Sequence, residues 1–226
     1  MRLTKRTVHL NVLSLKRKNL VTKDTFFWPN GLLASSLEWS HRLDENKEDL
    51  RNLIKYYNNW INKGVPLKNA DYTINGYSLI YLYEKTKRKK YLKTIEFLID
   101  YIKSRKRTEI GSIPYRDGNP NQIMIDSLGM ICPFLCRYGD MFNDESSINL
   151  AVKQLVNFLK YGMDKKSGLP YHGYNLQIGA KLGIIGWGRG IGWLLIGLVD
   201  SLEYIPKSHE KYDYLCNALN EIVHNV

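Results

Sequence analysis

Apolar residues recur along this chain at the spacing of helix faces. In the segment 47–62 they fall three or four residues apart, at Leu50, Leu53, Ile54, Tyr57, Trp60 and Ile61. Similar segments predict eight helices, at 31–43, 47–62, 74–86, 88–104, 124–138, 146–161, 191–204 and 209–225. Asn46 and Ser146 stand where the N-caps of two of these helices belong. Only short stretches such as 110–115 are candidates for strands, so the sequence predicts an all-α chain.

The links between these helices alternate between short and long. Short links join the helices in pairs, and long links, at 63–73, 105–123 and 162–190, join each pair to the next. A row of helical hairpins that repeats roughly every 45–60 residues is typical of a helical toroid or solenoid. The helices at 124–138 and 191–204 are apolar nearly all round, so we expect them to be buried on all sides. The even-numbered helices carry the charged faces, which predicts an inner and an outer layer, with function in the long loops of one rim.

Composition narrows the class of protein. The chain has 226 residues, of which 44% are hydrophobic, and no apolar run reaches the roughly 18 residues of a membrane span. The net charge is +11, and residues 1–23 contain seven Lys or Arg and no acidic residue. We interpret residues 1–23 as a flexible basic segment ahead of a barrel domain at 24–226, with attraction to an acidic polymer as the alternative. No nucleic-acid-binding module is recognisable, so no nucleic-acid partner is expected.

The cysteines and the N-terminal sequence indicate in which cellular compartment we expect the protein. Three cysteines give no disulfide framework, and Cys132 and Cys136, one helical turn apart in an apolar stretch, read as buried thiols. No Cys/His spacing fits a structural zinc site, and no metal or cofactor is expected. The apolar stretch near the N-terminus is interrupted by polar residues and lacks a cleavage site. The sequence therefore predicts a cytoplasmic protein without a membrane partner.

Two aspartates at matching points of consecutive hairpins are the candidate catalytic residues. Asp126 enters an otherwise apolar helix in "MIDSLGM", where burial would favour the protonated form that a general acid needs. Asp71 precedes the helix predicted at 74–86. Each carboxylate is also well placed to cap its helix, and that alternative stays open for both. Paired acids in one cleft are the usual apparatus of sugar chemistry, which favours a catalytic pair.

The long loops bring aromatic and basic residues to the same rim. The candidates for binding a substrate are Trp28, Tyr171, His172, Trp187, Arg189 and Trp193. Arg189 lies among four glycines in "GWGRGIGW", with room to offer a bidentate fork to a carboxylate. The aromatic rings can stack on a sugar or fill the core. The glycines do not match the spacing of a dinucleotide-binding loop, and no strand precedes them.

The ordered set "MIDSLGMICPFL", "YHGYN" and "GWGRGIGW" resembles the unsaturated glucuronyl and rhamnogalacturonyl hydrolases of glycoside hydrolase families 88 and 105, over about residues 26–204. The resemblance implies an (α/α)6 barrel and a substrate oligosaccharide with a 4,5-unsaturated uronic acid at its non-reducing end. It implies that an aspartate protonates the double bond, that water adds, and that the resulting hemiketal collapses. Asp126 matches the acid/base residue, Asp71 the second carboxylate, and His172, Trp187, Arg189 and Trp193 the substrate pocket. The resemblance also implies that the glycines of "GWGRGIGW" let the backbone approach the sugar.

The chain departs from the family's pattern at Asn175, where an acidic residue is frequent, at Ile191, where a polar residue is common, and in length. We expect about four hairpins, in a barrel that is shortened at its C-terminal end and has an open apolar edge. Three explanations stay open: the chain is a fragment, it closes by self-association, or it is a shortened relative that has lost catalysis. The alternative function is a non-catalytic carbohydrate-binding or polysaccharide-assembly protein on a truncated barrel. A sugar epimerase is disfavoured because only His172 is well placed among the histidines.

Overall fold

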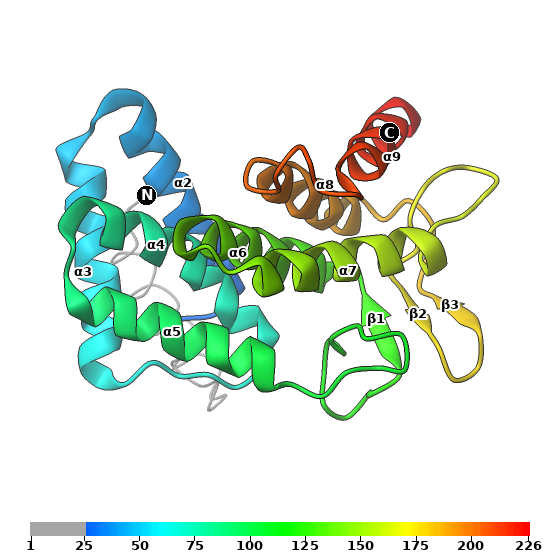
Figure 1. Ribbon diagram of the computed structural model, residues 1–226, viewed down its shortest axis with the longest axis horizontal. Helices are drawn as coiled ribbons and strands as arrows, with labels where there is room; N and C mark the ends of the chain where they lie inside the picture. The colour runs from blue at the N-terminus through cyan, green and yellow to red at the C-terminus, as the bar shows by residue number, and fades with distance from the viewer. Residues whose placement is uncertain (1–25) are drawn as a thin grey trace, which may run out of the picture. The chain divides into compact units, whose positions relative to one another are not determined.

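The computed structural model describes residues 26–226 and contains four successive pairs of helices (Figure 1). The pairs are α2 (Trp28–Asp44) with α3 (Lys47–Lys63), α4 (Asn75–Thr86) with α5 (Lys89–Ser104), α6 (Asp126–Phe142) with α7 (Glu145–Tyr161), and α8 (Gly188–Leu202) with α9 (Tyr212–Asn225). A 3-10 helix, η1 (Ala70–Ile74), precedes α4. All eight predicted helices are confirmed to within a few residues at their ends. The predicted basic segment 1–23 lies outside the described residues.

The described chain divides into two compact units, and the predicted single domain over 24–226 stays a prediction. Within the described residues, the first unit contains 26–68 together with 72–98, and the second contains 69–71 together with 99–226. In the first unit, Asn46 caps α3 as predicted, because its side chain accepts a hydrogen bond of 2.9 Å from the backbone N–H of Glu48. The core of this unit is rich in tyrosine, and the buried Asn75 satisfies its polar groups by accepting from the hydroxyl of Tyr56 at 3.1 Å and from that of Tyr57 at 3.0 Å.

Helix α6 forms the centre of the second unit. Every residue from 126 to 137 is buried, which confirms the prediction for this helix. Helices α7 and α8 both pack on α6 (Figure 1). Helix α8 approaches so closely because glycines face the contact: a Cβ added to Gly129 of α6 would lie 2.6 Å from Cε3 of Trp193, and one added to Gly197 of α8 would lie 3.0 Å from the backbone carbon of Leu128.

Helix α8 differs from the prediction for 191–204 in two respects. It begins three residues earlier and includes Gly188 and Gly190, which the sequence assigned to the preceding loop, whereas Gly186 lies outside it at φ +70°. Gly190 packs closely, because a Cβ added there would lie 3.1 Å from the Ile125 side chain, whereas a Cβ added to Gly188 would have nothing within 4 Å. The helix is also not buried on all sides, since only one of its faces packs on α6 and Val199 is 51% exposed.

Three short strands form an antiparallel sheet beside α6 in the order β1 (Gln122–Met124), β2 (Gly173–Asn175) and β3 (Ala180–Leu182). The stretch 110–115, which was a candidate for a strand, is a turn. Two of its backbone N–H groups donate to side chains: that of Ser112 to Oγ1 of Thr108 at 3.0 Å, and that of Ile113 to Oε1 of Gln154 at 2.6 Å. The segment therefore has no ladder to join.

The start of α7 also differs from the prediction. Asp144, not Ser146, is the N-cap, and its side chain accepts from the backbone N–H of Ser147 at 3.3 Å. Ser146 lies in the first turn, where its hydroxyl donates to the same carboxylate at 2.5 Å. A carboxylate at this position also interacts favourably with the positive end of the helix dipole.

Cys132 and Cys136 are buried free thiols in α6, as predicted. Burial raises the pKa of the Cys136 thiol to about 12, and a thiol so far from its thiolate is chemically inert. Within residues 26–226, none of the helices combines the length and the apolar character that crossing a bilayer requires.

Candidate active site

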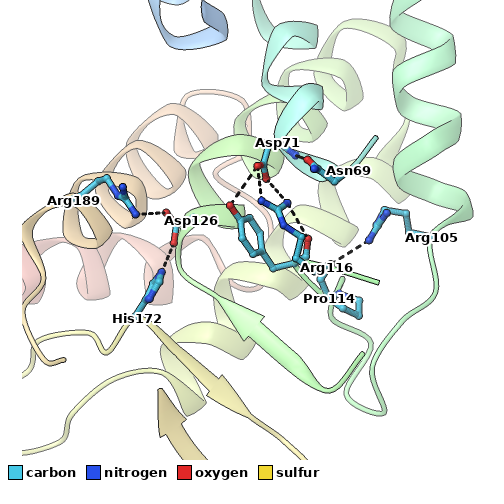
Figure 2. A network of polar contacts seen from close by, with 9 residues as sticks. Asn69, Asp71, Arg105, Pro114, Arg116, Asp126, His172 and Arg189 are labelled. Carbon is cyan, nitrogen blue, oxygen red and sulfur yellow. Dashed lines mark hydrogen bonds and ion pairs between the residues drawn. The ribbon is translucent and has the colours of Figure 1, made fainter. Parts of the chain in front are cut away.

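Asp126 and His172 form the centre of the candidate site (Figure 2). Asp126 is the first residue of α6 and is only 5% exposed. Its Oδ2 lies 2.7 Å from Nε2 of His172. A proton lies between these two atoms: either the imidazole N–H donates to the carboxylate, or the carboxylic O–H donates to the nitrogen. The pair can therefore hold a proton ready for transfer and take one back.

The backbone fixes this pair in register. Strand β1 ends at Met124, which pairs with Gly173 at the start of β2. The ladder continues by one step, because the N–H of Ile125 donates to the carbonyl of His172 at 2.9 Å. The residues that follow β1 and precede β2 are thus brought together by main-chain hydrogen bonds, and Asp126 meets His172 for that reason.

Two glycines allow close packing near His172, Gly173 against strand β1 and Gly183 against the histidine itself. A Cβ on Gly173 would lie 2.4 Å from Sδ of Met124, and one on Gly183 would lie 2.6 Å from Cβ of His172. Gly183 also has φ +74°, a left-handed conformation that side chains with a Cβ rarely adopt. The glycine-rich loop therefore supports the histidine from behind.

Trp187 and Arg189 complete the cluster. The Trp187 ring packs edge-on against the His172 imidazole at 4.5 Å between centroids. The Arg189 guanidinium lies over the Trp187 ring, 4.0 Å from its centroid. Nη2 of Arg189 is 3.9 Å from Oδ1 of Asp126 (Figure 2). The Arg189 side chain is 56% exposed, so most of its donors face solvent. The Arg189 cation therefore lies at the edge of the site and is not neutralised by a close ion pair with Asp126.

Asp71 has a different set of partners. It lies in η1 and is 4% exposed. Arg116 binds it in a fork, with Nη1 3.0 Å from Oδ1 and Nη2 2.9 Å from Oδ2. The hydroxyl of Tyr115 donates to the same Oδ2 at 3.4 Å.

The Tyr115 phenol responds to both aspartates. Burial raises the pKa of Tyr115, and the charge of Asp71 and, to a lesser extent, that of Asp126 raise it further, well above its ordinary value of 10.0. The phenol therefore stays protonated and acts as a donor. Since Asp126 and Asp71 both act on this one group, the two predicted catalytic carboxylates contribute to one electrostatic environment.

The remaining predicted residues are Tyr171, Trp193 and Trp28. Tyr171 is partly exposed next to His172, with the Lys181 ammonium 4.7 Å from its ring centroid. Trp193 is 3% exposed and packs on α6, so its ring fills the core at the α6–α8 contact. Trp28 begins α2 in the first unit, where its ring contacts Phe27 at 6.3 Å between centroids. That Trp28 binds the same substrate stays a prediction.

Sequence reasoning missed Tyr115 and Arg116. The stretch "PYRDG" at 114–118 reads as an ordinary polar turn, and nothing in its spacing connects it to Asp71. The signal available was its place in the long link 105–123, which enters the helix of Asp126. A basic residue beside an aromatic in such a loop is a candidate partner for a buried carboxylate.

The two departures from the family's pattern also have defined places. Asn175 ends β2, where its side-chain oxygen accepts from the backbone N–H of Gln177 at 3.0 Å and so shapes the turn to β3. Ile191 is 7% exposed in the second turn of α8. Among residues 26–226, no group of three or more His, Cys, Asp or Glu is arranged to hold a metal ion, and the expectation of no cofactor stays a prediction.

A groove of about 960 Å³ lies away from this cluster, lined by the C-terminal end of α6, by α7 and by the loop before α9. Its lining includes Asn149 and His209, which are hydrogen-bonded to each other at 2.9 Å. None of the predicted site residues lines it. We therefore place the candidate site at Asp126 and His172 because of the chemistry of their side chains, and not because of the size of a groove.

The model of Glycosyl Hydrolase Family 88 matches residues 3–226. The chain is 22% identical over 200 residues to the unsaturated rhamnogalacturonyl hydrolase YesR of Bacillus subtilis (strain 168), which covers 86% of this chain and 58% of that protein. A solved glycoside hydrolase from family 105 of C. acetobutylicum ATCC 824 superimposes with a TM-score of 0.84 at 27% identity, over 100% of this chain and 65% of that one. A solved unsaturated glucuronyl hydrolase specific for heparin gives a TM-score of 0.70 at 22% identity, over 87% and 55%.

These similarities confirm the predicted fold class, an α/α toroid built of helical hairpins, and the predicted resemblance. The chain spans less than two thirds of the length of each of these three proteins.

Proposed function

The chain belongs to glycosyl hydrolase family 88, and from that premise we propose that it hydrolyses oligosaccharides with a 4,5-unsaturated uronic acid at their non-reducing end. The similar proteins described above include hydrolases named for unsaturated rhamnogalacturonyl and unsaturated glucuronyl substrates. The substrate would be acidic, and the reaction would need no metal or cofactor. A cytoplasmic location stays a prediction.

The observation that carries this proposal is the hydrogen bond of 2.7 Å between the buried Asp126 and His172. The double bond of an unsaturated uronic acid is a vinyl ether, because its C5 carries the ring oxygen. Such a bond is protonated at C4, which leaves a cation at C5 that the ring oxygen stabilises. Asp126, in its carboxylic form, is the proton donor to C4, and positioned general acids of this kind contribute about 10²–10⁴-fold to a rate.

Water then adds at C5. The carboxylate that Asp126 has become, supported by His172, accepts the proton of the attacking water, so the site returns to its starting protonation state. The addition gives a hemiketal at C5, which opens by breaking the bond from C5 to the ring oxygen. C1 is then a hemiacetal, and its collapse to an aldehyde releases the remaining saccharide as an alcohol. The charges and atoms of this sequence balance without an oxidant or reductant.

Arg189 and Trp187 suit the recognition of such a sugar. The exposed guanidinium of Arg189 has donors free for the substrate carboxylate, and a bidentate fork matches that group. The stacked Trp187 ring holds the guanidinium in place and separates it from the core. The 56% exposure of Arg189 means that the substrate, once bound, would replace water at this cation.

The test is a spectroscopic assay on unsaturated uronyl disaccharides produced by polysaccharide lyases. Turnover removes the ultraviolet absorbance of the conjugated double bond. We expect loss of absorbance with the parent chain and at least about a 10²-fold lower rate with Asp126→Asn, because the amide cannot supply the proton. Asp140→Asn is the matched control, since Asp140 lies on the same helix but is exposed at its other end.

A folded parent that leaves the absorbance unchanged with disaccharides of both substrate classes would overturn the proposal. It would favour the carbohydrate-binding alternative. Equal rates for the parent and Asp126→Asn would show that the proton comes from another group.

A further inference from the structure

Positive charge is concentrated where α4 ends and α5 begins (Figure 1). Positions 85–93 hold six basic residues, which we call the basic turn: Lys85, Lys87, Arg88, Lys89, Lys90 and Lys93. All of them are exposed except Lys90, which is partly exposed. The nearest acidic residues in the sequence are Glu84 and Glu96, so no acidic residue interrupts the run.

The basic turn is not neutralised by the chain that surrounds it. Among residues 26–226, none of its cations forms an ion pair with an acidic side chain. Three of its lysines lie over tyrosine rings instead, with 5.5 or 5.6 Å between Nζ and the ring centroid: Lys85 over Tyr81, Lys87 over Tyr83, and Lys90 over Tyr91. A tyrosine ring attracts a cation without cancelling its charge, so the positive charge of the turn stays available to a partner.

The cations at the start of α5 stand at the wrong end of a helix. Lys89 and Lys90 are its first two residues, and its first turn contains no acidic residue. The N-terminal end of a helix is already positive, so it favours carboxylates and repels cations. Lys89 and Lys93 also form a like-charged pair at i and i+4, which destabilises a helix. These charges therefore lower the stability of α5.

Lys87 occupies another position where a different residue would be more stable. It is the C-cap of α4, and its backbone N–H donates to the carbonyl of Tyr83 at 2.8 Å. Its φ is +53°, a left-handed conformation in which glycine or asparagine is usual. A segment that departs from local preferences at several neighbouring positions, with no compensating ion pair, is typical of a functional surface.

A surface of this kind suits a polymer with regularly repeated negative charge. Attraction between such a polymer and an uncompensated group of cations acts at long range and needs no shaped cavity. Each sugar of a uronic acid polymer carries a carboxylate, and the chain belongs to a glycoside hydrolase family. The choice of an acidic polysaccharide over other polyanions rests on the proposed function.

We propose that the basic turn is a second carbohydrate-binding surface, which holds the protein on an acidic polysaccharide. The reaction itself takes place at the non-reducing end of a chain, at Asp126 and His172. Binding through the basic turn raises the concentration of such ends around the protein. The surface belongs to the first unit, whereas Asp126 and His172 belong to the second.

The test measures binding to fluorescently labelled polygalacturonate, hyaluronan, neutral dextran and duplex DNA by anisotropy, at low and high salt. We expect the parent to bind both acidic polysaccharides, less tightly as the salt concentration rises, and not to bind dextran. The double variant Lys89→Glu with Lys90→Glu should bind the acidic polysaccharides at least about tenfold more weakly. The matched control is Lys47→Glu with Lys55→Glu on α3, which reverses two exposed lysines and changes the net charge equally. It should bind much as the parent does.

The melting temperature separates a binding role from a structural one. Lys89→Glu with Lys90→Glu should melt at a higher temperature than the parent, because acidic residues replace cations at the positive end of α5. Lys87→Gly should also melt higher, since it relieves the left-handed lysine, and should bind the acidic polysaccharides more weakly. Weaker binding by a more stable protein cannot come from a loss of fold. Variants of the basic turn that melt lower and bind more weakly would point to a structural role and overturn the proposal.

Three other outcomes would overturn it: a parent that binds neither acidic polysaccharide, equal losses in the basic-turn variant and the α3 control, or tighter binding to duplex DNA than to both polysaccharides at the same salt. The absorbance assay on disaccharides keeps this test apart from that of the proposed function. There the variant Lys89→Glu with Lys90→Glu should keep the kcat/KM of the parent. A parent that turns over disaccharides but binds neither polymer would overturn this inference alone. A parent that binds the polymers and turns over no disaccharide would overturn the proposed function and leave the binding surface standing.

Discussion

Replacing Gly129 with alanine tests how closely α6 and α8 are packed. The added Cβ would lie 2.6 Å from Cε3 and 2.7 Å from the backbone carbonyl oxygen of Trp193. A carbonyl in the middle of a helix cannot swing aside, so the helices must separate. Overpacking of this kind costs about 1–3 kcal/mol, and the backbone contact puts Gly129→Ala at the upper end of that range. The gain in helix propensity, about 1 kcal/mol, offsets part of it.

The net loss in the free energy of unfolding is therefore about 2 kcal/mol, which lowers the melting temperature by roughly 4–8 °C in a chain of this size. Gly192→Ala is the matched control, because Gly192 lies in α8 with nothing within 4 Å of the added Cβ. In Gly192→Ala only the helix propensity changes, and we expect the free energy of unfolding to rise by about 0.5–1 kcal/mol. Thermal and urea unfolding measure the stability of both variants. A Gly129→Ala protein as stable as the parent, or two variants shifted in the same direction, would refute the close contact of α6 with α8.

Two further predictions follow from the site and from the start of α7. Gly183→Ala should lower kcat/KM by about 10–100-fold, because the residue has φ +74° and its new Cβ would lie 2.6 Å from Cβ of His172. Gly179→Ala is the control and should lower stability alone, because it is strained at φ +63° but its Cβ would lie no closer than 3.7 Å to any group. Equal activities of the two variants would contradict the argument. Burial would raise the pKa of Asp144, but hydrogen bonds from Lys103 and two serines lower it to about 2 from 3.8. The stabilisation is thus present above pH 3.8 and is lost as the pH falls through about 2, so the advantage of the parent over Asp144→Asn in urea unfolding should shrink across that window. A constant difference would show that the charge of Asp144 is not responsible.

The helices were predictable from sequence because their apolar periodicity records the face that each one buries. The sites where this failed have a common cause. Gly188 and Gly190 of "GWGRGIGW" indicated a loop by local propensity, yet both lie in α8, where a Cβ on Gly190 would be only 3.1 Å from the Ile125 side chain. Likewise Ser146 had the properties of an N-cap, but the neighbouring Asp144 takes that place with its stronger acceptor. In both cases a tertiary or electrostatic partner decided between locally similar options.

The candidate site was predictable only where its residues stood out from their surroundings. Asp126 did so, as an acid in an apolar helix, and His172 did so in a loop rich in glycine and tyrosine. Their pairing did not follow, because it depends on strands of three residues that are too short to give a periodic signal. Tyr115 and Arg116 were missed because a polar turn resembles any other until its buried partner, Asp71, is known.

The short ladder between β1 and β2 has a consequence for how this protein can change over time. Because Asp126 directly follows one strand and His172 directly precedes the other, their relative placement depends on a few consecutive main-chain bonds and not on the lengths of the connecting loops. Residues can be added or removed between 105 and 121, or in the turn from β2 to β3, without shifting the pair. A single insertion between Ile123 and Asp126 would instead turn the aspartate to the opposite side. Loop length can therefore diverge among descendants of this chain while the placement of Asp126 against His172 is inherited unchanged.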